Sequence, residues 1–169
     1  MASGAGVSRV LVIGYGNPLR RDDGVGPAVA ARVAADPRMR GAVVLAEHQL
    51  APELAADMAG ADRVILIDAA DGVPAGEVGV RVLGRGPMEE PASTIGDVDA
   101  GGPPLTHHVS PASLAGLARE LYGVAPALVV VSVGAASFEM GEGLTPSVDA
   151  AVPAAMEAVI AAALEVADA

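Results

Sequence analysis

The sequence predicts an α/β fold, a three-layer sandwich in which a mostly parallel, twisted sheet of five strands carries helices on both faces. Apolar runs rich in Val and Ile alternate with segments of helical periodicity along the chain. Aromatic residues make up only 2% of the chain, so Ala, Val, Leu and Ile must build the core. The length of 169 residues suits a single domain over residues 1–169.

Five apolar runs are expected to form strands, because Val, Ile and Leu dominate them as they do in sheets buried on both faces. These runs are residues 9–14, 42–47, 63–68, 77–83 and 127–133. The fourth run, EVGVRVL, has the weakest alternation of the five. Because helical segments separate most of these runs, the strands are expected to pair mostly in parallel.

Four segments are expected to form helices: residues 24–35, 53–59, 111–122 and 147–166. In the first, valines recur at helical spacing. Pro52 stands at a helix-opening position before the second, and Ser110 followed by Pro111 predicts the capped start of the third. The fourth is rich in Ala and closes the chain. Residues 85–105 lack a regular pattern and are interpreted as a mobile flap that brings His107 to the sheet edge.

Charge and composition exclude several classes of function. The formal net charge of −11 argues against a nucleic-acid partner, which would need a basic face. Without cysteine, the chain has no disulfide, zinc–thiolate site or cysteine nucleophile, which fits a reducing compartment. Residues 1–8 lack the pattern of a signal peptide, and Glu157 and Glu165 interrupt the apolar C-terminal segment. We therefore expect a cytoplasmic protein without membrane insertion.

Three side chains that could carry out chemistry, Asp23, Asp68 and His107, each stand at or after the end of an expected strand. Asp68 ends the strand at residues 63–68, Asp23 lies in the loop after the first strand, and His107 ends the long loop after the fourth. The carboxyl ends of parallel strands lie on one edge of an open sheet, where ligand crevices form. Two carboxylates and an imidazole on that edge would suit a borderline divalent metal. An ionised carboxylate at the end of a buried strand, such as Asp68, also needs a partner or a cation.

Neighbouring residues leave alternatives at each position. Asp22 is expected to be the N-terminal cap of the first helix, which leaves Asp23 free to project into the crevice. His107 and His108 are adjacent, so only one of them is expected to be a ligand. The sequence does not decide whether His48 lies near the site or on the surface.

The glycine loop GYGNPL (residues 14–19) offers a competing interpretation, because it resembles the start of a dinucleotide-binding fingerprint. Its third glycine would fall at Leu19, and Glu47 could serve as the ribose-binding acid. Asp22 and Asp23, however, place negative charge where a phosphate would need a helix N-terminus free of it. The loop is better interpreted as a turn that presents an acid.

Several ordered motifs resemble those of the hydrogenase maturation proteases, the endopeptidases that trim the C-terminal extension from the large subunit of nickel–iron hydrogenases. The strongest is GYGNPLRRDDGVGPAVA at residues 14–30. It is followed by HQLAPELA (48–55), VILIDA (64–69), THHVSPASLAGLARELYG (106–123) and SFEMGEGLTPSV (137–148). The resemblance covers nearly the whole chain. One departure is visible at residues 134–137, GAAS, where the family often has a Pro–Glu pair before the Ser.

The resemblance implies a metal-dependent endopeptidase whose nickel-contacting residues are Asp23, Asp68 and His107, with His108 as the alternative to His107. It implies that the partner is a hydrogenase large-subunit precursor and that this precursor supplies the Ni²⁺, for which another divalent metal could substitute. The alternative function is a metallochaperone or maturation checkpoint that binds the precursor without cutting it.

Overall fold

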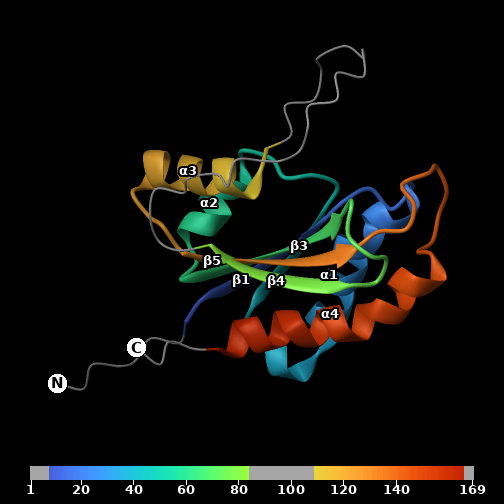
Figure 1. The fold of residues 1–169 in the computed structure, drawn as a ribbon. Coiled ribbons are helices and arrows are strands. Elements are labelled where there is room, and N and C mark those ends of the chain that lie inside the picture. The colour runs from blue at the N-terminus through green and yellow to red at the C-terminus, as the bar shows by residue number, and fades with distance from the viewer. Residues whose placement is uncertain (1–7, 84–108, 166–169) are drawn as a thin grey trace, which may run out of the picture.

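The computed structural model describes residues 8–83 and 109–165, in which strands and helices alternate (Figure 1). The strands are β1 (Val10–Tyr15), β2 (Val43–Glu47), β3 (Arg63–Ala70), β4 (Val78–Leu83) and β5 (Ala127–Gly134). The α-helices are α1 (Val25–Ala35), α2 (Leu54–Ala59), α3 (Pro111–Tyr122) and α4 (Pro146–Leu164). Two short 3₁₀ helices, η1 (Arg21–Gly24) and η2 (Pro37–Met39), flank α1. Most bounds lie within two residues of those expected, and β3 continues to Ala70 instead of ending at Asp68.

The sheet has the strand order β2-β1-β3-β5-β4, and its first four strands run parallel. The prediction of a mostly parallel, five-stranded sheet is confirmed. β4 pairs antiparallel with β5 at one edge, so its carboxyl end lies opposite to the carboxyl ends of the other four strands. The expectation that β4 ends on the same edge as β1 and β3 is therefore wrong. The direction of β4 gives no position for His107, which lies outside the described residues.

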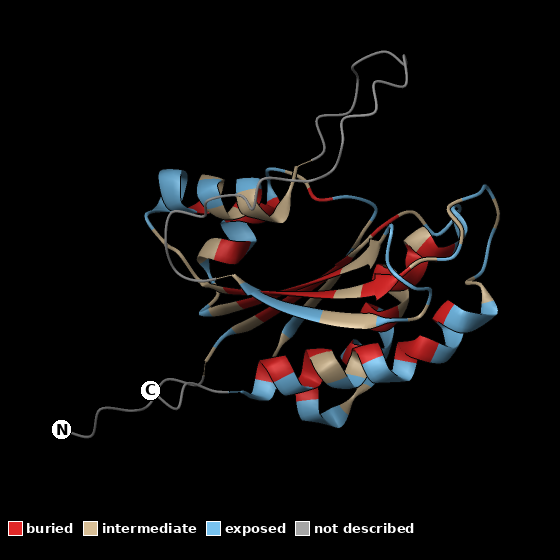
Figure 2. Cartoon of the chain, in the orientation of Figure 1, coloured by how far each residue is buried: buried red, intermediate tan, exposed pale blue. Residues whose placement is uncertain are grey.

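Helices cover both faces of the sheet, which confirms the three-layer sandwich (Figure 1). On one face, α1 and α4 pack with Val12, Ile65 and Val131. On the other, α2 and α3 pack with the alternate residues of the same strands, including Ile13 and Leu66. Side chains on both sides of the central strands are therefore buried, and in Figure 2 long stretches of these strands are coloured as buried. This burial on both faces explains why their sequences are nearly continuous apolar runs.

Among the described residues, only α4 is long and apolar enough to cross a membrane by length and composition. Its buried positions, among them Val152, Val159 and Ile160, pack in the core that α4 forms with α1 and one face of the sheet. The apolar composition of α4 is therefore explained by its packing in the core.

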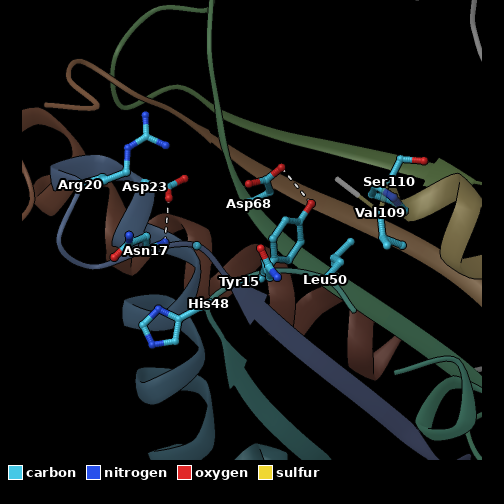
Figure 3. A pocket seen from close by; sticks show the side chains of 12 residues that line it. Tyr15, Asn17, Arg20, Asp23, His48, Leu50, Asp68, Val109 and Ser110 are labelled. Atoms are coloured by element: carbon cyan, nitrogen blue, oxygen red, sulfur yellow. Dashed lines mark hydrogen bonds between the residues drawn. The ribbon is translucent and has the colours of Figure 1, made fainter. Parts of the chain in front are cut away.

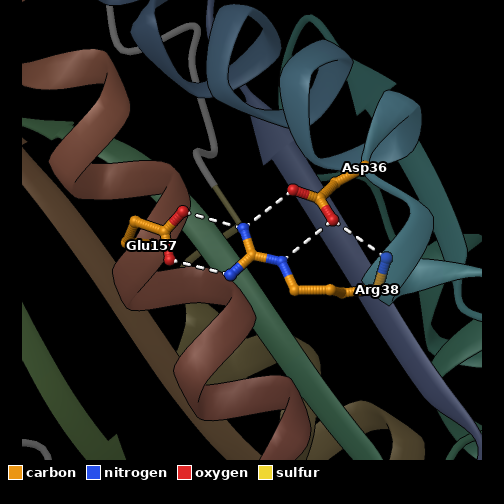
Figure 4. A network of polar contacts seen from close by, with 3 residues as sticks. All are labelled: Asp36, Arg38 and Glu157. Atoms are coloured by element: carbon orange, nitrogen blue, oxygen red, sulfur yellow. Dashed lines mark hydrogen bonds and ion pairs between the residues drawn. The ribbon is translucent and has the colours of Figure 1, made fainter.

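An ion-pair network on the surface ties α4 to the segment that follows α1 (Figure 4). One nitrogen of the Arg38 guanidinium, Nη2, lies 2.8 Å from a carboxylate oxygen of Asp36 and 2.8 Å from one of Glu157. A second nitrogen, Nη1, donates to the other oxygen of Glu157 at 3.0 Å. The planar guanidinium thereby binds the Glu157 carboxylate in a bidentate manner and links η2 to α4.

The start of α1 packs directly against the backbone of β1 and β3, and this contact requires glycine at position 26. A Cβ atom on Gly26 would lie 2.4 Å from the carbonyl oxygen of Tyr15 and 2.6 Å from that of Ile67. Because both neighbours are backbone atoms, neither can move aside without shifting a strand. Gly26 thus sets how closely η1, which carries Asp23, approaches the sheet.

We predict that Gly26→Ala lowers the free energy of unfolding by about 1–3 kcal/mol or more, because the added methyl group overlaps two strand carbonyls. Gly116→Ala in α3 is the matched control, since nothing lies within 4 Å of the position that its methyl group would take. That control should raise stability by about 0.5–1 kcal/mol through helix propensity alone. Urea denaturation followed by circular dichroism measures both, and equal effects of the two substitutions would contradict the packing argument.

Candidate functional site

A pocket with a volume of about 480 Å³ opens at the carboxyl edge of β1 and β3. Its walls come from segments far apart in sequence: the end of β1 and the loop after it, residues 48–50 after β2, Asp68 in β3, and residues 109–111 at the start of α3. This is the edge at which open α/β sheets bind ligands. Both predicted acids, Asp23 and Asp68, line this pocket.

Asp23 reaches the pocket from η1 because the glycine loop turns tightly beneath it. Gly16 has a φ of +142°, and a Cβ atom there would lie 1.8 Å from the carbonyl oxygen of Asp23. The backbone N–H of Asn17 donates to Asp23 Oδ2 at 2.7 Å. In a dinucleotide site, a backbone N–H of the glycine loop would point to a phosphate. Here the N–H of Asn17 points to the carboxylate of Asp23 instead, as expected of a turn that presents an acid.

Asp68 lies within β3 and is largely enclosed by the residues around it. The hydroxyl of Tyr15 donates to Asp68 Oδ2 at 2.9 Å. Burial raises the pKa of Asp68 to about 6, and the negative charge of Asp23 adds to the rise. Hydrogen bonds from Tyr15 and from the backbone N–H of Ala69 oppose this rise without cancelling it. An ionised Asp68 is therefore destabilising unless a cation compensates it.

The two carboxylates are arranged alike (Figure 3). Each has one oxygen held by a hydrogen bond, from the backbone of Asn17 for Asp23 and from the side chain of Tyr15 for Asp68. In Figure 3 the other oxygen of each carboxylate lies on the side that faces the other acid. Two like charges aimed at one space repel each other, and a bound cation would relieve that repulsion.

Asp22 does not cap a helix, so the sequence-based prediction for this residue is wrong. It is fully buried, and its carboxylate accepts hydrogen bonds from the backbone N–H groups of Ala136 (2.8 Å), Ser137 (3.0 Å) and Thr145 (2.7 Å) and from the Thr145 hydroxyl. Burial alone would raise the pKa of Asp22, but these hydrogen bonds hold it below its ordinary value. Asp22 therefore joins the glycine loop to the loop between β5 and α4.

The GAAS segment at residues 134–137 has a role in this junction. It supplies two of the backbone donors that bind Asp22, those of Ala136 and Ser137. Ser137 also accepts a backbone hydrogen bond from Asp22 at 3.1 Å. Because the contacts use backbone atoms, they do not depend on the side chains by which this segment departs from the family pattern.

The histidines divide into one that is described and two that are not. His48 is exposed and lines the pocket, whereas His107 and His108 lie outside the described residues. The described chain resumes at Val109, which itself lines the pocket beside Ser110. Within residues 8–83 and 109–165, no three His, Asp or Glu side chains are placed to hold a metal together.

The polar pocket residues that sequence reasoning missed include Tyr15, Asn17 and Arg20. Tyr15 follows an apolar run, as Asp68 follows the residues ILI. This shared position at the end of a strand could have indicated that Tyr15 lies beside the site. Asn17 acts through its backbone, which no side-chain pattern reveals. Arg20 is exposed, and its guanidinium lies 5.9 Å from the centre of the Phe138 ring.

The fold and site define an α/β protein with an acidic pocket at the carboxyl edge of a mostly parallel sheet. Solved structures that match it across most of the chain include hydrogenase maturation proteases. The hydrogenase maturating endopeptidase HybD from E. coli is 27% identical with a TM-score of 0.68, and the comparison covers 91% of each chain. An endopeptidase from Escherichia coli, solved in solution, is 28% identical with a TM-score of 0.69 and the same coverage.

A third neighbour, the hydrogenase maturation protease HycI from Thermococcus kodakarensis KOD1, is 21% identical over 92% of each chain, with a TM-score of 0.66, and at this identity supports the fold alone. No protein-family model matches the sequence, and no curated protein matches it significantly. The structural neighbours across most of the chain thus include hydrogenase maturation proteases, at 21–28% identity.

We predict that Asp22→Asn lowers the free energy of unfolding by about 2–4 kcal/mol at pH 7, because an amide N–H₂ would face buried backbone donors. The folded pKa of Asp22 is depressed, so its stabilising contribution is present above the unfolded pKa of about 3.9 and is lost as the pH falls through the folded value. The difference between wild type and variant should therefore shrink below about pH 4. Chemical denaturation at pH 7 and pH 3 measures it, with the exposed Asp71→Asn as control.

We predict the opposite sign for Asp68→Asn, which should raise the free energy of unfolding by about 1–3 kcal/mol at pH 7. The folded pKa of Asp68 is raised to about 6, so ionisation costs stability increasingly between the unfolded pKa of about 3.9 and pH 6 and fully above pH 6. Asparagine keeps an acceptor for Tyr15 without the charge. Thermal denaturation at pH 7 and pH 5 should show that the variant gains less stability over the wild type at pH 5. A loss of stability at pH 7 would contradict burial as the cause of the raised pKa of Asp68.

Proposed function

We propose that this protein is an endopeptidase that removes the C-terminal extension of a nickel-loaded nickel–iron hydrogenase large-subunit precursor. In this proposal Asp23, Asp68 and His107 recognise the nickel that the precursor carries. The observation that carries the proposal is the pair of carboxylates, Asp23 and Asp68, which share one pocket and each turn one oxygen toward the other.

The donor chemistry of the pocket fits this cargo. Carboxylate oxygens and an imidazole nitrogen are ligands for borderline divalent ions, and affinity among the first-row metals rises toward nickel and copper. The strain of holding Asp68 ionised beside Asp23 favours a partner that brings positive charge. His107 is assigned from the resemblance of the THH segment, and Val109, two residues further along the chain, lines the pocket.

Nickel held between the two proteins would polarise the scissile carbonyl and make cleavage conditional on metal insertion. The residues of this chain would bind and orient the precursor's metal. Asp23 and Asp68 are each held through one oxygen by a hydrogen-bond donor, so the other oxygens need little rearrangement when the metal binds. With no cysteine in the chain, the pocket offers no thiolate for covalent catalysis, so we infer direct hydrolysis by water.

The structural neighbours support the same class of reaction. The two neighbours from E. coli that exceed 25% identity are endopeptidases by name, and HybD is named as a hydrogenase maturating enzyme. The proposed reaction takes place in the cytoplasm, and the lack of cysteine in the chain fits that reducing compartment.

We predict that Asp23→Ala and Asp68→Asn each reduce processing of a nickel-loaded precursor more than about 100-fold, exceeding the loss typical of residues that only support a metal ligand. His107→Ala and His108→Ala, tested separately, should show which imidazole is required. The readout is the mass of the precursor after incubation with purified protein. Asp57→Asn, an exposed acid on α2 outside the pocket, is the matched control and should process normally.

The outcomes separate the proposal from its rival. Processing of the loaded but not the nickel-free precursor by the wild type supports the endopeptidase. A stable complex with the loaded precursor that never loses mass would instead favour the non-cleaving checkpoint. Full processing by both Asp23→Ala and Asp68→Asn would remove the two carboxylates from the mechanism.

A further inference from the structure

Tyr15 links the sheet to the acidic pocket. It is the last residue of β1, and the parallel register that pairs Gly14 with Ile67 brings Tyr15 beside Asp68 on the neighbouring strand. Its ring packs against the core on the α2–α3 face, and its hydroxyl reaches Asp68 Oδ2 at 2.9 Å. The pairing of β1 with β3 therefore sets the distance between the two groups.

The Tyr15 hydroxyl acts only as a donor in this position. A phenol carries its proton at neutral pH, and the Tyr15 hydroxyl donates that proton to Asp68 Oδ2. Among the side chains of residues 8–83 and 109–165, no other donates a hydrogen bond to Asp68. Tyr15 is therefore the one side chain of the described residues that holds the Asp68 carboxylate, together with the backbone N–H of Ala69.

Asp23 shows what this contact accomplishes. Its Oδ2 is held by the backbone N–H of Asn17, and its other oxygen faces Asp68. Tyr15 gives Asp68 the same arrangement through a side chain, with Oδ2 held and the other oxygen turned toward Asp23 (Figure 3). Supporting hydrogen bonds of this kind fix the orientation of carboxylates that bind metals.

We propose that Tyr15 is a positioning residue that holds Oδ2 of Asp68 and so aims the other oxygen at the metal carried by the precursor. The inference rests on the proposed function and adds to it a residue outside the expected triad. Tyr15 itself touches neither the metal nor the scissile bond. Its removal should therefore weaken the binding of the metal-bearing substrate instead of abolishing the chemical step.

The test uses the two tyrosines of the chain, Tyr15 and Tyr122, as a matched pair. Tyr15→Phe keeps the ring and removes only the hydroxyl, whereas Tyr122→Phe removes a hydroxyl from the half-exposed end of α3. With nickel-loaded precursor, Tyr15→Phe should lower kcat/KM by about 10–100-fold, mainly through a higher KM. Tyr122→Phe should match the wild type.

A second readout does not depend on cleavage. In protein labelled with ¹³C at the tyrosine ring carbon that bears the hydroxyl, the two tyrosines give two resonances, which the two Phe variants assign. Paramagnetic Ni²⁺ alone, titrated to millimolar concentration, should broaden the Tyr15 resonance before that of Tyr122. Asp68→Asn should abolish this preference.

The results distinguish failure of the inference from failure of the proposed function. If the wild type does not process the loaded precursor, the proposed function fails and the inference falls with it. If the wild type processes normally, three results overturn the inference alone. They are wild-type kinetics for Tyr15→Phe, a loss confined to kcat with KM unchanged, or equal broadening of both tyrosine resonances by Ni²⁺. A higher KM together with selective broadening of Tyr15 supports it.

Discussion

The arrangement of the pocket depends on a buried carboxylate that does not belong to it. Asp22 gathers donors from Ala136, Ser137 and Thr145, all more than 100 residues away in sequence, and binds the glycine loop to the loop before α4. Asp23 is the next residue, so its direction is set by how its neighbour is held. A full set of hydrogen bonds makes the buried charge of Asp22 stabilising, whereas an incomplete set would make it costly.

Asp22 and Asp68 show how environment separates residues of the same type. Asp22 is fully buried and Asp68 is partly buried. Hydrogen bonds from four donor groups lower the pKa of Asp22, whereas the sparser contacts of Asp68 leave its pKa raised to about 6. The first carboxylate is satisfied by its own fold. Asp68 has no positive charge to compensate it among its contacts in the described residues. This is typical of a carboxylate that binds a ligand and does not stabilise the fold.

Much of the fold could be predicted from the sequence because it rests on local pattern. Runs of Val and Ile mark β1, β3 and β5, and Ser110 followed by Pro111 marks the start of α3. The direction of β4 could not be predicted, because it depends on which partner the strand meets and not on its own residues.

The candidate site was predictable to a similar degree. Asp23 and Asp68 were found because an acid after an apolar run is conspicuous, and the structure places both in one pocket. The partners of Asp22 and the register that sets Tyr15 beside Asp68 are long-range relations with no local signal. His107 and His108 fall outside the described residues, and the roles of all three members of the expected triad stay predictions.

The exposed edge strand β4 has a consequence for how copies of this molecule meet one another. Its outer side has no neighbouring strand among the described residues, and Val80 and Val82 are 56% and 69% exposed there. An open, apolar strand is a ready template for unwanted pairing between chains. Arg81, which stands between the two valines, puts a charge in the middle of that edge, a common natural safeguard against aggregation.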